Sequence, residues 1–161
     1  MDIFKSSRHS KIAGDFGESL VLYWLSKFGF ECARVDHTGI DLIARNPHTV
    51  EVMGISVKSR TRTRVKEEDS ITIPSGNFEK ATAACRAFGC IPYFAVVVDA
   101  AEVIRVFLLQ MDHFLRICPV KERGAYWQVS NKYLDQYMSD PEIKIFELRT
   151  STKSWWRNLA T

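Results

Sequence analysis

An aspartate and a lysine lie on two neighbouring apolar segments of the chain, with a short turn between them. Asp41 belongs to segment 40–45, and Lys58 belongs to segment 55–60. Both segments are rich in isoleucine and valine, which favours strands, and residues 46–49 are typical of a hairpin turn. A carboxylate that holds a divalent ion, beside a lysine that positions water, suits metal-assisted phosphodiester cleavage. The alternative is a salt bridge across a sheet, which contributes little stability.

A glutamate on the apolar side of a predicted helix is the third candidate. Segment 10–28 has helical periodicity, and Glu18 falls in its apolar arc next to Val21 and Leu25. A carboxylate in a core is costly unless it is paired or binds a metal, so we expect Glu18 to have a partner. A cation at a site built around Asp41 is the natural partner. Alternatively, Glu18 lies at the edge of the arc and reaches water.

Basic residues occupy every second position from Lys58 onward. In an extended conformation such side chains point to one side, where they suit a phosphate backbone. The alternative is a solvated edge strand whose charges discourage aggregation. We call these residues the basic strip: Lys58, Arg60, Arg62, Arg64 and Lys66.

Composition indicates a globular protein. We expect residues 1–161 to form one domain, with an ordinary apolar fraction of 46% and charged fraction of 25%. No segment approaches a membrane span and the N-terminus has no signal-like apolar region, so we expect a cytoplasmic protein. The four cysteines lack CxxC spacing, which argues against zinc and favours reduced core thiols. The four histidines show no ligand spacing, which favours incidental roles.

The positioning elements can be read from periodicity and turn residues. We expect helices at about 10–28, 76–88, 112–117 and 131–138, with Ser75 or Asn77 as an N-cap and Gly89 as a C-terminal stop. Strands are expected at about 30–36, 40–45, 50–60, 70–73, 93–98, 103–109, 127–129 and 143–148. The continuous apolar run at 93–98 predicts a strand covered on both faces. The layout predicts an α/β fold, a mixed central sheet flanked by helices.

The C-terminal tail combines aromatic and basic residues. Such a tail can stack on bases and contact phosphates. The simpler interpretation, which we favour, is that it folds back and its tryptophans fill a surface groove. The residues concerned are Arg149, Lys153, Trp155, Trp156 and Arg157.

The order of these motifs resembles the PD-(D/E)XK nuclease superfamily, and within it the restriction-endonuclease-like and archaeal Holliday-junction-resolvase-like branches. The matching segments are 14–18, 38–44 and 55–60, followed by the helix and strand at 78–98. The likeness covers about residues 10–110, which leaves 111–161 as a C-terminal extension. It implies a restriction-endonuclease-like core.

The resemblance also implies roles for individual residues. Asp41 would be the principal metal ligand, and Glu18 would assist directly or through water. Val57 would offer its backbone carbonyl to the metal, and Lys58 would orient the nucleophilic water. The expected ion is Mg²⁺, or Mn²⁺, since hard oxygen ligands suit these metals. The basic strip beyond Lys58 would contact the nucleic acid.

One position departs from the family pattern. The second acidic residue belongs two positions before the lysine, where this chain has Ser56, a weak ligand. Glu51 lies on the same predicted strand but about 20 Å away along it. Glu18 is therefore the better compensating ligand, and we expect activity to be lowered rather than excluded.

Two functions from different classes follow. The first is a metal-dependent endonuclease acting on DNA phosphodiesters, with RNA as the alternative substrate. The second is a nuclease-fold binding module that has lost its chemistry and binds nucleic acid, or a protein as an inhibitor or immunity partner would. A homodimer is also expected from the resemblance, although no motif marks an interface.

Overall fold

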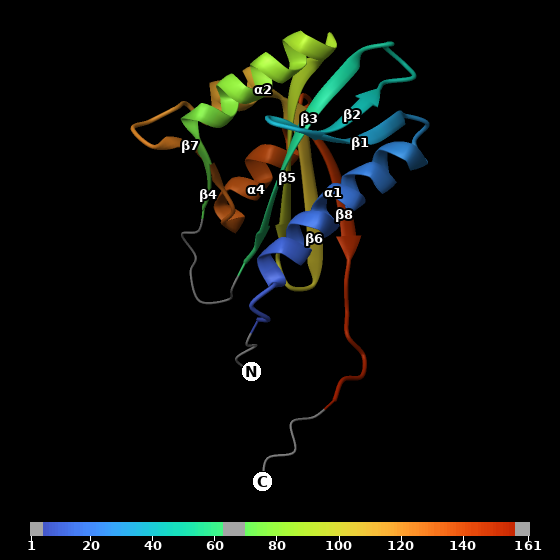
Figure 1. The fold of residues 1–161 in the computed structure, drawn as a ribbon. Helices are drawn as coiled ribbons and strands as arrows, with labels where there is room; N and C mark the ends of the chain where they lie inside the picture. The colour runs from blue at the N-terminus through green and yellow to red at the C-terminus, as the bar shows by residue number, and fades with distance from the viewer. Residues whose placement is uncertain (1–4, 63–69, 157–161) are drawn as a thin grey trace.

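A six-stranded sheet runs through the computed structural model, which describes residues 5–62 and 70–156 (Figure 1). The strand order is β1-β2-β3-β5-β6-β8; β3 and β5 are parallel and the other pairs antiparallel, so the sheet is mixed as predicted. A separate antiparallel pair, β4-β7, was not foreseen as a second sheet. The elements are α1 His9–Lys27, β1 Glu31–His37, β2 Ile40–Arg45, β3 Val52–Thr61, β4 Ser70–Pro74, α2 Ser75–Phe88, β5 Ile91–Asp99, β6 Val103–Gln110, α3 Met111–Ile117, β7 Gly124–Gln128, α4 Asn131–Met138 and β8 Lys144–Arg149.

The sheet is covered on both faces, and β5 shows this most clearly. Ala95 and Val97 belong to the core beneath α1, whereas Phe94 and Val96 belong to the core on the opposite side. Successive strand residues alternate between faces, so a strand buried on both sides must be apolar throughout. The prediction from the run 93–98 is confirmed. Figure 1 shows α1 crossing one face of the sheet.

Two glycines allow the elements around the start of β2 and β3 to approach closely. A Cβ at Gly17 of α1 would lie 2.1 Å from the Ser59 hydroxyl oxygen on β3. Gly39 precedes β2 with a φ of +102°, and a Cβ there would lie 2.3 Å from the backbone oxygen of Lys80 on α2. Larger side chains at either position would push a helix away from the sheet.

The helix ends confirm one prediction and correct another. Gly89 follows α2 in the left-handed conformation, at φ 67° and ψ 36°, and its amide donates to the carbonyl of Cys85. Neither Ser75 nor Asn77 is the N-cap. Pro74 occupies that position without a side-chain cap, because β4 runs directly into the helix and Ser75 is already its first residue.

Within the described residues, the C-terminal tail does not fold back into a groove; Arg157 lies outside the part of the chain that the structure describes. Trp155 and Trp156 are 70% and 82% exposed, and their rings contact each other in a T-shaped pair at 5.1 Å. The chain leaves the sheet after Arg149 and runs away from it (Figure 1), so the tryptophans reach no groove. The preferred interpretation of the tail was therefore wrong.

The expectation that the cysteines are reduced core thiols holds fully for two of the four. All four cysteines are free; Cys85 and Cys118 are buried, whereas Cys32 and Cys90 are only half-buried. None of the described helices is both long enough and apolar enough to cross a membrane.

Candidate active site

Strands β2 and β3 part at the position where the predicted catalytic residues begin. Their paired register runs from Arg45 opposite Val52 to Leu42 opposite Ile55 and then stops. Beyond it, the Asp41 carboxylate enters the gap, and its Oδ2 accepts a hydrogen bond from the backbone N–H of Val57 at 2.7 Å. We call residues 39–41 and 56–58 the fork. At the fork a side-chain carboxylate replaces the carbonyl that would have continued the ladder.

Ser56 holds the two branches of the fork together. Its side chain is buried, with 4% exposed, and its hydroxyl donates a hydrogen bond to the carbonyl of Gly39. A carboxylate at this position would face that carbonyl oxygen without a proton to share. The serine, where the resemblance led us to expect an acid, is thus accommodated by a specific local contact. Its oxygen keeps lone pairs for a ligand, although it carries no charge.

Glu18 approaches the fork from α1. Its side chain is 28% exposed. Burial raises the pKa of Glu18, and the nearby negative charge of Asp41 raises it further, while Arg34 partly opposes the shift. The charges of the two carboxylates therefore interact. Two acids held close together favour a cation between them or a proton on one of them.

Arg34 of β1 is a residue that sequence reasoning missed. Its Nη1 lies 3.8 Å from the Glu18 carboxylate, and its Nη2 donates to the carbonyl of Asp15 at 3.0 Å and to the hydroxyl of Ser19. The predicted partner of Glu18 is thus, at least in part, a protein cation. Arg34 is half-exposed and sits opposite Leu42 in the sheet register, next to Asp41.

Lys58 lies on β3 directly after Val57 and is half-buried. It stands opposite Val96 in the register with β5 and two residues from Ser56, so it shares that residue's side of the strand. Within residues 5–62 and 70–156, its ammonium group forms no hydrogen bond or ion pair. Asp41 and the Val57 amide are thus in contact, Glu18 is near enough for the charge of Asp41 to raise its pKa, and Lys58 follows Val57 on β3.

The basic strip is only partly described. Arg60 is exposed on β3, and Arg62 follows the end of the strand, where its guanidinium donates to Asn131 at 3.2 Å. Arg64 and Lys66 lie outside the described residues. The described part of the strip is therefore Lys58 and Arg60 on β3 and Arg62 directly after it.

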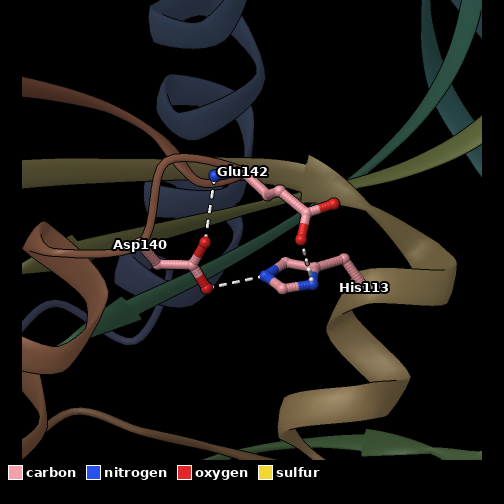
Figure 2. Close-up of side chains that lie close together, drawn as sticks. All are labelled: His113, Asp140 and Glu142. Atoms are coloured by element: carbon pink, nitrogen blue, oxygen red, sulfur yellow. Dashed lines mark hydrogen bonds and ion pairs between the residues drawn. The ribbon is translucent and has the colours of Figure 1, made fainter.

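A second cluster of ionisable side chains lies away from the fork, between α3 and the turn before β8 (Figure 2). His113 Nε2 is 2.7 Å from Asp140, and His113 Nδ1 is 3.2 Å from Glu142. Arg116 reaches both His113 Nδ1, at 2.9 Å, and Glu142, at 3.3 Å. We call these four residues the clamp. No ligand spacing around His113 was visible in the sequence, because its partners are 27 and 29 positions away.

The clamp is better explained as an ion-paired contact than as a metal centre. One ligand atom from each of His113, Asp140 and Glu142 lies within 4.8 Å of the others, which fits one ion by distance alone. The two carboxylates, however, address different ring nitrogens, which point in different directions, so one ion cannot replace both contacts. Arg116 also supplies a positive charge already.

Asp140 shows how fully the clamp is compensated. Although burial acts in the opposite direction, hydrogen bonds from His113 and from the backbone N–H of Glu142, with the charges of His113 and Arg116, lower the pKa of Asp140. The ionised carboxylate is the favoured form there.

Comparison with solved structures identifies the fold. No protein-family model matches the chain, and no curated protein matches it. A Holliday junction resolvase from Archaeoglobus fulgidus is similar with a TM-score of 0.54 at 20% identity, over 76% of this chain and 88% of that one. A bacterial homing endonuclease is similar with a TM-score of 0.50 at 14% identity, over 80% and 78% of the two chains. Together with the mixed sheet flanked by helices, these likenesses show that the chain has a restriction-endonuclease-like fold.

Proposed function

We propose that this protein is a metal-dependent nuclease that cleaves DNA phosphodiesters at the fork. The observation that carries the proposal is the position of Asp41 where β2 and β3 part, near enough to Glu18 for its charge to raise the pKa of Glu18, with Lys58 directly after Val57 on β3. A carboxylate whose pKa is raised by burial and by a second carboxylate, near a lysine that pairs with none of the described residues, is typical of a site organised for a ligand rather than for stability.

The residues at the fork fit a hard divalent ion, Mg²⁺ or Mn²⁺. Asp41 uses Oδ2 to accept the Val57 N–H, and among the described residues its Oδ1 makes no hydrogen bond, so one oxygen is left to bind an ion. Glu18, the Val57 carbonyl and, weakly, Ser56 supply further oxygen ligands of the type these ions prefer. When bound, the ion would polarise the phosphate and activate a water molecule.

Lys58 would act on the reacting groups directly. Its ammonium group can donate a hydrogen bond to the attacking water and balance the charge that develops on the phosphate oxygens. Ser56 has a positioning role, because its hydrogen bond to the Gly39 carbonyl fixes the backbone just before Asp41. The Val57 amide likewise orients the Asp41 carboxylate.

DNA is the substrate that the surroundings of the fork support best. Arg60 and Arg62 continue from Lys58 along the same strand, and such a row can follow a phosphate backbone. The similar structures are a Holliday junction resolvase and a homing endonuclease, so a four-way junction and a long duplex are the first substrates to test. RNA of the same sequence serves as the comparison.

The test is cleavage of supercoiled plasmid and of a four-way junction, with Mg²⁺ or Mn²⁺, by the wild type and by Asp41→Ala and Lys58→Ala. Each variant should lose at least about a hundredfold in rate, more than outer-shell changes usually cause. Matched controls are Asp135→Ala on α4 and Lys27→Ala on α1, two exposed residues away from the fork. Equal cleavage by the wild type and both fork variants would contradict the proposal, because the activity would then come from a contaminant.

A binding module without catalysis is the second candidate, and Ser56 is the observation that favours it. Calorimetric titration with Mn²⁺ in the presence of DNA separates the two functions. The nuclease proposal requires a binding isotherm that Asp41→Ala abolishes. Absence of metal binding, combined with DNA binding that weakens with salt and in Arg60→Ala, would support the binding module instead.

A further inference from the structure

A largely apolar cavity of ≈ 140 Å³ lies between the N-terminal half of α1 and the ends of three strands. Phe16 and Ile12 of α1 are at its rim and are 43% and 54% exposed, although both are large and hydrophobic. Ala13 also lines it. The remaining lining residues are His9, Ser59, Arg60, Thr61, Val97, Asp99 and Ile104.

The cavity is next to the proposed active site, because α1 and β3 contribute residues to both. Phe16 lies two residues before Glu18 on α1, and Ser59 follows Lys58 on β3. Between them, Gly17 brings the helix against the strand, since a Cβ there would lie 2.1 Å from the Ser59 hydroxyl oxygen. A group held in the cavity would therefore belong to the same nucleic-acid strand as a phosphate at the fork.

The chemistry of the walls suits a flat ring with a polar edge. Phe16 offers an aromatic face, and Ile12, Val97 and Ile104 supply apolar contacts. Polar groups are confined to one side, where His9 Nε2 is 3.1 Å from the Thr61 hydroxyl and where Asp99 also lies. Arg60, which lines the cavity, places positive charge there for a flanking phosphate.

We propose that this cavity receives one unstacked nucleobase of the DNA strand bound at the fork, with Phe16 stacking on its face. The inference rests on the proposed function for the position of the strand. Enzymes that hold bases outside the helix use pockets of this kind, in which aromatic and apolar side chains cover the ring and polar groups meet its edge.

The test measures binding rather than cleavage. Fluorescence anisotropy measures how tightly the Asp41→Asn variant binds a labelled single-stranded oligonucleotide. The same measurement is made with copies of the oligonucleotide that each carry one abasic site, at successive positions. An abasic site at one position should weaken binding about tenfold, the loss expected for one stacked base. Ala13→Phe, which fills the cavity, and Phe16→Ala should remove this discrimination. Tyr23→Ala is the matched control, because Tyr23 is an exposed aromatic of the same helix outside the cavity.

A second probe guards against misfolded variants. A 2-aminopurine placed at the sensitive position should fluoresce more strongly in the complex, because leaving the stack of neighbouring bases relieves their quenching. The rise should be lost in Ala13→Phe, which fills the cavity, while the thermal unfolding midpoint stays close to that of the parent.

The outcomes distinguish the two proposals. Cleavage by the wild type without abasic discrimination overturns the nucleobase pocket and leaves the nuclease intact. Discrimination without cleavage supports the pocket and contradicts the nuclease. If sedimentation shows a dimer that Phe16→Ala dissociates, while DNA binding is unaffected, a second copy of the chain covers the cavity and the pocket is overturned.

Discussion

The fork and the clamp each combine two carboxylates with an arginine, yet a carboxylate pKa is raised at the fork and lowered at the clamp. At the fork the pKa of Glu18 is raised, first by burial and then by Asp41, with Arg34 3.8 Å away. At the clamp the pKa of Asp140 is lowered, because His113 bonds it at 2.7 Å in the presence of Arg116. The difference is whether the protein itself supplies enough positive charge.

Under the proposed function, this difference separates the cation site at the fork from a structural contact at the clamp. The clamp is complete without a ligand, so its charges contribute to the stability of the link between α3 and β8. The fork is under-compensated, and such a site lowers stability in exchange for affinity toward a cation. The number of acidic residues alone, similar in both clusters, does not distinguish the two.

Adding a third acid to the fork should enlarge the contrast most. We expect Ser56→Asp to destabilise the metal-free protein by about 2 kcal/mol, because it buries a charge and removes the hydrogen bond to the Gly39 carbonyl. Mn²⁺ should bind it more tightly than the wild type. Urea denaturation with and without Mn²⁺ measures both effects.

Ser26→Asp provides the control for that substitution. Ser26 also donates its hydroxyl to a backbone carbonyl, that of Tyr23, but it is exposed. Its replacement should cost less than about 1 kcal/mol. If Ser56→Asp destabilised the protein as little as the control does, or bound Mn²⁺ no more tightly than the wild type, the description of the fork as short of positive charge would be wrong.

Breaking the clamp should lower stability without affecting the fork. We expect His113→Ala to cost about 1–3 kcal/mol, because it removes the hydrogen bond between the ring and Asp140 and empties a buried position. DNA cleavage below the unfolding temperature should stay at the wild-type level. His48→Ala, at an exposed histidine in the β2–β3 turn, is the control. Loss of cleavage in folded His113→Ala would mean that the clamp takes part in function.

The pH dependence of stability should run in opposite directions for the two clusters. Because the pKa of Asp140 is lowered from 3.8, its contribution is present above pH 3.8 and is lost as the pH falls through the lower folded-state pKa. Because the pKa of Glu18 is raised from 4.5, the folded state holds its proton longer, and stability falls as the pH rises from about 4.5 through the folded-state pKa.

Denaturant midpoints between pH 3 and 7 for the wild type, Asp140→Asn and Glu18→Gln would resolve these slopes. Asp140→Asn should flatten the loss on the acid side only, and Glu18→Gln should flatten the fall above pH 4.5 only. Identical profiles for all three proteins would show that neither carboxylate is coupled to folding as described.

The sequence predicted what depends on local pattern. Strand 40–45 was predicted with its observed bounds, and Gly89 ends α2 as expected, because alternation and left-handed termini are properties of neighbouring residues. Arg34 was missed because its contacts with α1 join segments that share no periodicity. His113 was missed for the same reason, and the tail tryptophans because composition does not show whether a groove lies within reach.

The smallest expected effect is also the one that most directly tests the source of the fork's charge. Glu18→Gln should slightly raise the thermal unfolding midpoint of the metal-free protein at pH 7, because it removes a carboxylate whose ionised form is disfavoured by burial and by Asp41. It should also reduce the stabilisation that added Mn²⁺ gives, since a ligand that binds only the folded state stabilises it in proportion to its affinity. Asp135→Asn, at an exposed acid of α4, should change neither quantity in this way. If Arg34 already neutralised Glu18, Glu18→Gln would instead lower the midpoint by breaking that ion pair. The sign of this small shift therefore decides whether the charge on Glu18 is held for Arg34 or for a metal ion.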